Sequence, residues 1–267
     1  MSRALDDDLL PRHGEDIDPV AMARKDLKTN LPKRFWKEVS IGPHEAGPFA
    51  LLLDGRPART PARHVLAFAS EPLAKLLQEE WAAVGDVLDP SQMPLTRLVN
   101  SALDGVATQI EAVQADAARY AASDLLCYRA EHPDRLVAHQ QAQWDPLLDW
   151  IKSRFGAELV TGAGVMFTTQ PAASVDCLRA VVGGVRDPLA LAALHTLTTL
   201  TGSLVLALAL AEKRCSLAEI WALAHLDEDF QMEIWGQDEE ALARRAQKFR
   251  EAQSASALLA LTYPQVS

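Results

Sequence analysis

Cysteine is scarce in this sequence, which has three among its 267 residues. Cys127, Cys177 and Cys215 are far apart along the chain, and no Cys-x-x-Cys pair occurs. Zinc sites and disulfide frameworks both need cysteines that are closely spaced or paired. The sequence therefore predicts neither kind of site, and free buried thiols are the simplest interpretation.

The sequence also lacks the short patterns that identify common catalytic sites. It contains no G-x-x-x-x-G-K-[ST] phosphate loop, no G-x-G-x-x-G after a predicted strand and no H-E-x-x-H metal pair. The pair Gly202 and Ser203 stands without the flanking residues of a nucleophile elbow. We therefore expect a protein that is not an enzyme and that needs no cofactor.

The sequence has fewer basic than acidic residues. The 26 Lys and Arg residues are outnumbered by 36 Asp and Glu residues, which gives a formal net charge of −10. Nucleic acids and anionic membranes both attract basic surfaces, so we expect neither nucleic-acid binding nor membrane attachment. A basic protein partner would fit this charge, although plain solubility is the simpler explanation.

The N-terminal segment MSRALDDDLLPRHGEDID has no apolar core, so it does not resemble a secretory signal. It is rich in Asp, whereas mitochondrial presequences are rich in Arg and poor in acids. We therefore predict a bacterial cytoplasmic protein in which residues 1–30 form a flexible acidic tail.

One long run, Leu189 to Ala211, lacks any charged residue and is long enough to span a bilayer. Its middle, however, contains His195, several threonines and Gly202. This polarity favours a helix that is buried on all sides in a soluble bundle, without membrane insertion. The run predicts a core position for most of four leucines: Leu204, Leu206, Leu208 and Leu210.

The first third of the chain has the pattern of a β structure. Short segments rich in β-branched and aromatic residues occur at 34–42, 49–53, 56–61 and 65–69. The stretch PHEAGP separates the first two, and Asp54-Gly55 is a turn pair between the second and third. We expect a small antiparallel sheet of hairpins within a β-rich N-terminal domain at residues 31–90.

Helical signals then dominate, which predicts a segregated α+β fold with a helical C-terminal domain at residues 91–267. Ser70 is typical of a helix N-cap, and Ser216 with Glu219 forms a capping box before a helix that we expect Gly236 to end. Asp238 is then expected to cap the last helix.

Apolar spacing predicts one helical face from Val106 to Tyr120, and a further helix at 136–155 that Pro146 kinks or restarts. Residues 158–170 fit either an extended excursion that rejoins the sheet or a loop.

Two charged groups could carry chemistry. The carboxylates between His225 and Glu240 include helix-spaced pairs that could bind a metal in a metal-dependent hydrolase, but no second cluster supplies further ligands. A solvated acidic helix face is the simpler interpretation. A basic group near two prolines could hold a phosphate or could be ordinary exposed charge; it comprises Arg56, Arg59, Arg63 and His64.

The segment Leu226 to Glu240 holds seven acids and neither Lys nor Arg. On a helix, Leu223, Leu226, Phe230 and Ile234 would form one apolar stripe, and Trp221, Met232 and Trp235 would lie on roughly the opposite side. A helix that is apolar on two sides is either enclosed within a bundle or offers one side to a partner.

Seven stretches of the sequence, in order, resemble the ATP-synthase assembly chaperones known as the "ATP twelve" family. They are KRFWKEV, LLLDGRPARTP, MPLTRLVNSALDG, SDLLCYRAE, QWDPLLDW, LHTLTTLTGSLVLALALA and LDEDFQMEIWGQDEEA. The resemblance extends from about Lys33 to about Ala260, with Phe230 where we would expect Trp. The acidic N-terminus differs from that of mitochondrial members and agrees with a bacterial origin.

The resemblance implies a β-rich domain followed by a helical domain, without nucleotide hydrolysis. It implies binding to the unassembled alpha subunit of the F-type ATP synthase until the beta subunit replaces it. We expect the chain to be a monomer. The resemblance also implies that the acid after the Trp-Gly pair matters, which corresponds to Glu240. A helix cap at Asp238 and a helical Glu240–Arg244 pair would explain these acids without any partner. The residues that we expect to contact the partner are Glu228, Met232, Trp235, Asp238, Glu239 and Glu240.

Overall fold

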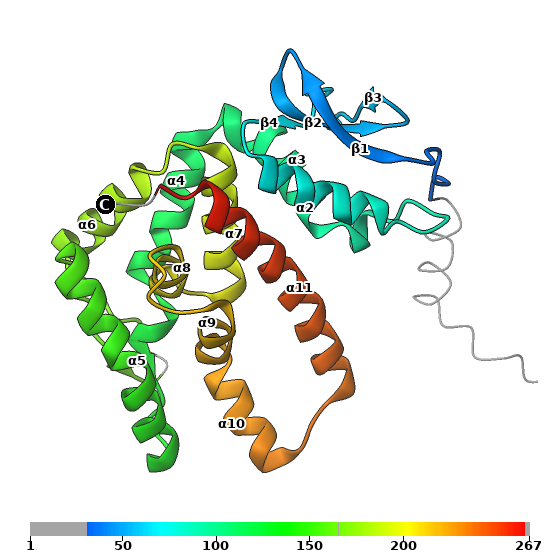
Figure 1. Ribbon diagram of the computed structural model, residues 1–267. Helices are drawn as coiled ribbons and strands as arrows, with labels where there is room; N and C mark the ends of the chain where they lie inside the picture. Colours follow the sequence, from blue (N-terminus) through cyan, green and yellow to red (C-terminus); the bar gives the residue numbers. More distant parts are fainter. Residues whose placement is uncertain (1–30, 165, 265–267) are drawn as a thin grey trace, which may run out of the picture.

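The computed structural model describes residues 31–164 and 166–264. A small sheet lies at one end of the molecule above α2 and α3, and the remaining helices form a bundle in which α11 runs beside α7 (Figure 1). This arrangement confirms the predicted α+β class. The predicted acidic tail at residues 1–30 lies outside the described residues.

The sheet is antiparallel, with β2 (Gly47–Leu53) at its centre. It pairs with β1 (Val39–His44), β3 (Arg56–Pro57) and β4 (Ala67–Phe68). The break that we expected at PHEAGP is shorter than predicted, because β1 includes Pro43 and β2 begins with Gly47 and Pro48. A register irregularity between Gly42 and His44 absorbs the proline in this edge strand.

Two helices hold the sheet against the bundle. Helix α2 (Glu71–Ala82) begins at Ser70, whose hydroxyl accepts a hydrogen bond from the backbone N–H of Leu73 as predicted. The carboxylate of Glu80 on α2 then accepts the backbone N–H groups of Leu95 and Thr96 at the start of α3 (Pro94–Asp104). One helix therefore caps the next, which fixes their relative position.

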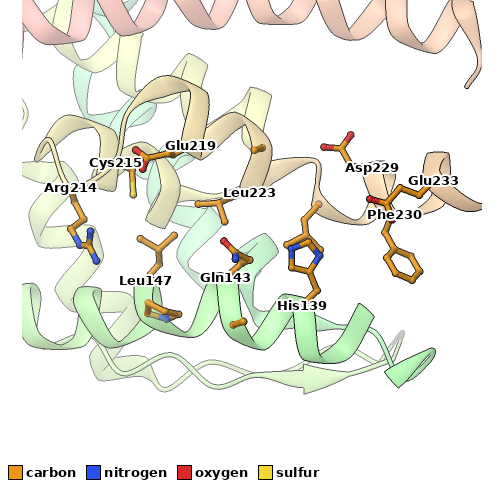
Figure 2. Close-up of a pocket in the computed structure, with 14 residues that line it drawn as sticks. His139, Gln143, Leu147, Arg214, Cys215, Glu219, Leu223, Asp229, Phe230 and Glu233 are labelled. Atoms are coloured by element: carbon orange, nitrogen blue, oxygen red, sulfur yellow. The ribbon is translucent and has the colours of Figure 1, made fainter. Parts of the chain in front are cut away.

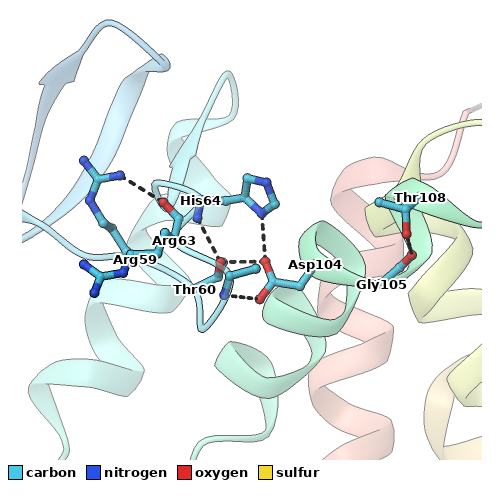
Figure 3. Close-up of polar contacts among 8 residues, drawn as sticks. Arg59, Thr60, Arg63, His64, Asp104, Gly105 and Thr108 are labelled. Atoms are coloured by element: carbon cyan, nitrogen blue, oxygen red, sulfur yellow. Dashed lines mark hydrogen bonds and ion pairs between the residues drawn. The ribbon is translucent and has the colours of Figure 1, made fainter.

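The predicted basic group lies at the junction between the sheet and the helices, where His64 contacts Asp104 of α3 (Figure 3). Asp104, at the end of α3, accepts hydrogen bonds from the Thr60 hydroxyl at 2.6 Å and the backbone N–H of Ala62 at 3.0 Å, and lies 2.8 Å from Nδ1 of His64. Burial alone would raise the pKa of Asp104, but the hydrogen bonds from Thr60 and His64 outweigh it and lower the pKa. Arg59 donates to the carbonyl of Arg63, so the phosphate hypothesis gains no support from this arrangement.

Three further helices build one side of the bundle: α4 (Ile110–Arg119), α5 (Asp134–Phe155) and α6 (Ala172–Gly183). Val106 lies in a separate 3₁₀ turn, so the apolar face predicted from it becomes helical only at Ile110. Helix α5 continues through Pro146 without restarting. Residues 162–163 form β6 and pair in parallel with β5 (Tyr128–Arg129), so this excursion does not rejoin the N-terminal sheet.

The charge-free run forms two helices where we predicted one. Helix α7 (Pro188–Thr201) ends at Gly202, whose φ of 69° is left-handed, and α8 (Leu204–Ala211) then begins with Ser203 as its cap. Leu204, Leu206 and Leu208 are completely buried, and Leu210 is partly buried, which confirms the predicted core. None of the helices in residues 31–164 and 166–264 is long and apolar enough to cross a membrane.

The C-terminal part contains α9 (Leu217–Ala224), α10 (Leu226–Trp235) and α11 (Glu239–Thr262). The capping box of Ser216 and Glu219 is present at the start of α9, as predicted. The helix expected to run from there to Gly236 is instead interrupted at His225, which separates α9 from α10.

Candidate functional site

The chain turns between α10 and α11 at Gly236, and we call residues 226–245 the acidic corner. Gly236 ends α10 with φ 89° and ψ 178°, a backbone conformation that is essentially restricted to glycine. Asp238 then accepts a 2.9 Å hydrogen bond from the backbone N–H of Glu240 and caps α11, as predicted. Local chain chemistry therefore sets the geometry of this corner.

A pocket of about 420 Å³ lies between α10 and α11. Its lining brings together four of the six residues predicted to contact a partner: Glu228, Met232, Trp235 and Asp238. Glu239 and Glu240 are not part of the lining and lie exposed in the first turn of α11. Whether any of the six contacts a partner remains a prediction.

Two large apolar side chains at the end of α10 are open to solvent. Trp235 is 86% exposed and Ile234 is 52% exposed. Exposed apolar surface next to polar groups is typical of protein–protein interaction sites, and Trp is enriched there. The predicted apolar stripe is thus only partly enclosed, because Leu226 and Phe230 are buried while Ile234 is not.

Trp221 does not lie on one helix side with Met232 and Trp235, as we predicted. It is 7% exposed, and its ring lies 4.3 Å from that of His225 and 5.2 Å from that of Phe249. The interruption at His225 changes the helix direction, so positions before and after it do not share one helical face. The exposed apolar residues of the corner therefore come from α10 alone.

Arginines neutralise part of the acidic corner. Glu240 pairs with Arg244 at 2.6 Å, which is the helical spacing that the sequence predicted. Asp229 pairs with Arg245, and Glu233 pairs with Arg135 of α5 at 2.8 Å. The other four carboxylates of the segment form no ion pair within residues 31–164 and 166–264; they belong to Asp227, Glu228, Asp238 and Glu239.

The carboxylates do not converge on a metal site. Nδ1 of His225 lies 2.8 Å from the carbonyl oxygen of Trp221, and burial lowers the pKa of this histidine. Asp229 is engaged with Arg245, and its hydrogen bond raises the pKa of that arginine. Among the described residues, no group of three or more His, Cys, Asp or Glu side chains is placed to hold a metal ion. The metal-dependent hydrolase hypothesis therefore has no support in the structure.

A second groove, which we did not predict, lies on the other side of α10. It has a volume of about 410 Å³ and separates α5 from α9 and α10 (Figure 2). Leu147 of α5, Leu223 of α9 and Phe230 of α10 are part of its lining. The apolar stripe was visible in the sequence, but the helix that faces it, α5, is far away in the chain.

Comparison with known proteins gives consistent matches. Residues 33–152 match the protein family described as ATP12 chaperone protein. A chaperone candidate from Agrobacterium tumefaciens is 47% identical, with a TM-score of 0.83 over 92% of this chain and 91% of that one. Atp12 from Paracoccus denitrificans is 44% identical, with a TM-score of 0.80 over 86% of this chain and 98% of that one. A mutant of the same Paracoccus protein, with an aspartate replaced by lysine, is 42% identical over 88% of this chain and 99% of that one, again with a TM-score of 0.80.

Proposed function

Because this chain belongs to the ATP12 chaperone family and is an ATP synthase assembly chaperone, we propose that it binds the unassembled alpha subunit of the F-type ATP synthase. It holds this subunit until the beta subunit takes its place. An alpha subunit on its own exposes the surface that will later contact beta, and exposed apolar interfaces promote aggregation. A protein that covers this surface and is then displaced would prevent aggregation without hydrolysing a nucleotide.

The exposed end of α10 is the observation that carries this proposal. Trp235 is 86% exposed, and Asp238, Glu239 and Glu240 follow it shortly afterwards in the sequence. A Trp supplies a large contact area, and the exposed Asp238, Glu239 and Glu240 would attract a basic partner surface. Arg244, Arg245 and Lys248 line the adjoining pocket, so the contact has mixed charge. A contact of modest size and mixed polarity can be strong enough to hold a subunit and weak enough to be replaced.

The relatives with solved structures come from bacteria, and we extend the proposal to a bacterial cytoplasmic protein that acts as a monomer. One copy would then hold one alpha subunit. Sedimentation of the purified complex tests this stoichiometry, because a complex with two copies of this chain would exceed the expected mass.

Affinity purification of the tagged, full-length chain from its own cells tests the central proposal. We expect the alpha subunit to be recovered in near-equal amount, with little or no beta subunit. Purified beta, added to the isolated complex, should release the alpha subunit from the tagged chain. Recovery of an assembled alpha–beta sector on the tagged chain would contradict the holding model.

A further inference from the structure

The groove between α5 and α9–α10 has an apolar floor that continues onto the exposed corner. Leu223 and Phe230 both point toward α5 (Figure 2). On α10 itself, the apolar row of Leu226 and Phe230 ends in Ile234, which is 52% exposed, next to Trp235. The same row of side chains is thus buried against α5 at one end and uncovered at the other, as expected where a partner completes the contact.

The wall formed by α5 combines apolar and polar groups. Pro146 has no backbone N–H, so it cannot donate to the carbonyl of Ala142 one turn earlier. Both residues line the groove. The amide of Gln143, on the same wall, adds a donor and an acceptor. An apolar floor beside a few polar groups is the usual composition of a peptide-binding groove.

The charged residues around the groove indicate which charge a segment that binds there should have. Three carboxylates line the groove, those of Glu219, Asp229 and Glu233, against one arginine, Arg214. Asp229 and Glu233 each pair with an arginine from outside the lining. A segment with apolar side chains flanked by Lys or Arg would complement this surface, whereas an acidic segment would be repelled.

Arg135 lies outside the lining of the groove but contacts two residues of it, Phe230 and Glu233. Its guanidinium lies 5.3 Å from the centre of the Phe230 ring and pairs with Glu233 at 2.8 Å. Both members of this pair are largely exposed, with side-chain exposures of 73% and 59%. An exposed pair of this kind contributes little stability, so a Lys or Arg of the occupant can exchange with Arg135 at low cost.

We propose that this groove receives an amphipathic, basic segment of the client subunit, whose apolar side chains insert between α5 and α10. The inference rests on the proposed function, since it takes the alpha subunit as the client. It adds a second contact area to the pocket between α10 and α11, and α10 separates the two. Helix-in-groove binding of this kind places apolar anchors at positions i, i+3, i+4 and i+7 of the bound segment.

A matched pair of variants tests the groove. Ala142 and Ala138 are both exposed on α5, one turn apart, but only Ala142 lines the groove. Ala142→Glu places a carboxylate where apolar side chains are expected to bind, while Ala138→Glu makes the same chemical change outside the lining. The readout is the light scattering of alpha subunit diluted from denaturant, measured against the concentration of each full-length chaperone variant.

We expect Ala142→Glu to require at least about tenfold more protein than the parent to halve the scattering, and Ala138→Glu to match the parent within about twofold. Circular dichroism and thermal unfolding establish that both variants fold. Equal potency of Ala142→Glu and the parent would overturn the groove proposal while the proposed function stands. A parent chain that neither binds the alpha subunit nor reduces its scattering would overturn both.

A photo-crosslinking residue at position 142 in the full-length chain provides an independent test that does not depend on loss of function. We expect it to join to an alpha-subunit peptide that carries apolar residues next to Lys or Arg, and we expect the same residue at position 138 to join much less. Crosslinks from position 142 to an acidic peptide, or to a second copy of this chain, would contradict the proposal.

Discussion

The carboxylate of Asp124 accepts a 2.7 Å hydrogen bond from the hydroxyl of Ser203, and both residues are completely buried. Asp124 also accepts the backbone N–H groups of Val205 and Leu126. It therefore serves as a cap for α8 that comes from a segment 79 residues earlier in the chain. Loss of solvation on burial outweighs these hydrogen bonds and raises the pKa of Asp124 to about 6, from an ordinary value of 3.8.

The raised pKa predicts a pH dependence of stability. The folded chain binds this proton more tightly than the unfolded chain does, so Asp124 stabilises the fold most below about pH 4, and this contribution is lost as the pH rises to about 6. Asp124→Asn removes the titration. Urea unfolding at several pH values should show the parent losing up to about 3 kcal/mol relative to the variant across this window. Parallel curves for the two proteins would contradict the prediction.

The buried leucines of α8 predict large losses of stability. Leu206 and Leu208 are completely buried, so truncation to Ala removes apolar contacts and leaves a cavity. Each of Leu206→Ala and Leu208→Ala should lower the free energy of unfolding by about 2 to 5 kcal/mol. Leu210→Ala is the comparison. Because Leu210 is only partly buried, its truncation should lower the free energy of unfolding by less. Melting temperatures like the parent's for both buried variants would disprove the packing of this helix.

Gly236 predicts a backbone effect at the acidic corner. A Cβ added there would meet no atom within 4 Å, but φ is 89° and ψ is 178°. Gly236→Ala should therefore destabilise the folded state by about 1 to 3 kcal/mol or reorient the corner, with weaker binding of the alpha subunit in either case. Gly85→Ala is the matched control, since its added Cβ also meets nothing and its φ is not left-handed. Urea unfolding and a binding assay should separate the two variants.

Signals within a few residues of each other predicted much of the fold. Ser70, Ser216 with Glu219, and Asp238 were each expected to cap a helix, and each does so through its own side chain. Such caps depend on backbone groups two or three residues away, so a single sequence contains all the necessary information.

Features that depend on distant contacts were missed. The division of the charge-free run has local signals in Gly202 and the capping Ser203, but Asp124 also caps the second helix, and no local pattern shows that Asp124 is nearby. The pairing of β6 with β5 and the groove between α5 and α10 are of the same kind. At the acidic corner, the sequence left open whether the second apolar side is enclosed or exposed. In the structure, Trp221 is enclosed and the exposed large apolar side chains are at the end of α10.

Substitution of Glu240 can distinguish a structural role of this carboxylate from a role in binding the alpha subunit. Its pair with Arg244 has side-chain exposures of 78% and 60%, so the pair itself contributes little to stability. An acid in the first turn of a helix adds about 0.3 to 1 kcal/mol through the helix dipole. If these were its only roles, Glu240→Lys would fold with a small loss of stability and would still bind the client.

We expect instead that Glu240→Lys folds normally by circular dichroism but fails to support assembly of the alpha subunit. A charge reversal in a desolvated interface removes about 2 to 5 kcal/mol of binding and adds repulsion. Glu71→Lys is a close structural control, because Glu71 occupies the first turn of α2 and pairs with Lys75 in the same i,i+4 arrangement at 2.7 Å. The two variants should lose a similar amount of stability, and only Glu240→Lys should fail to bind the alpha subunit. Glu239→Lys, which points about 100° aside on the helix, should have a smaller effect. Normal ATP synthase assembly with Glu240→Lys would show that this carboxylate is not a binding residue, while the chain's place in the family would stand.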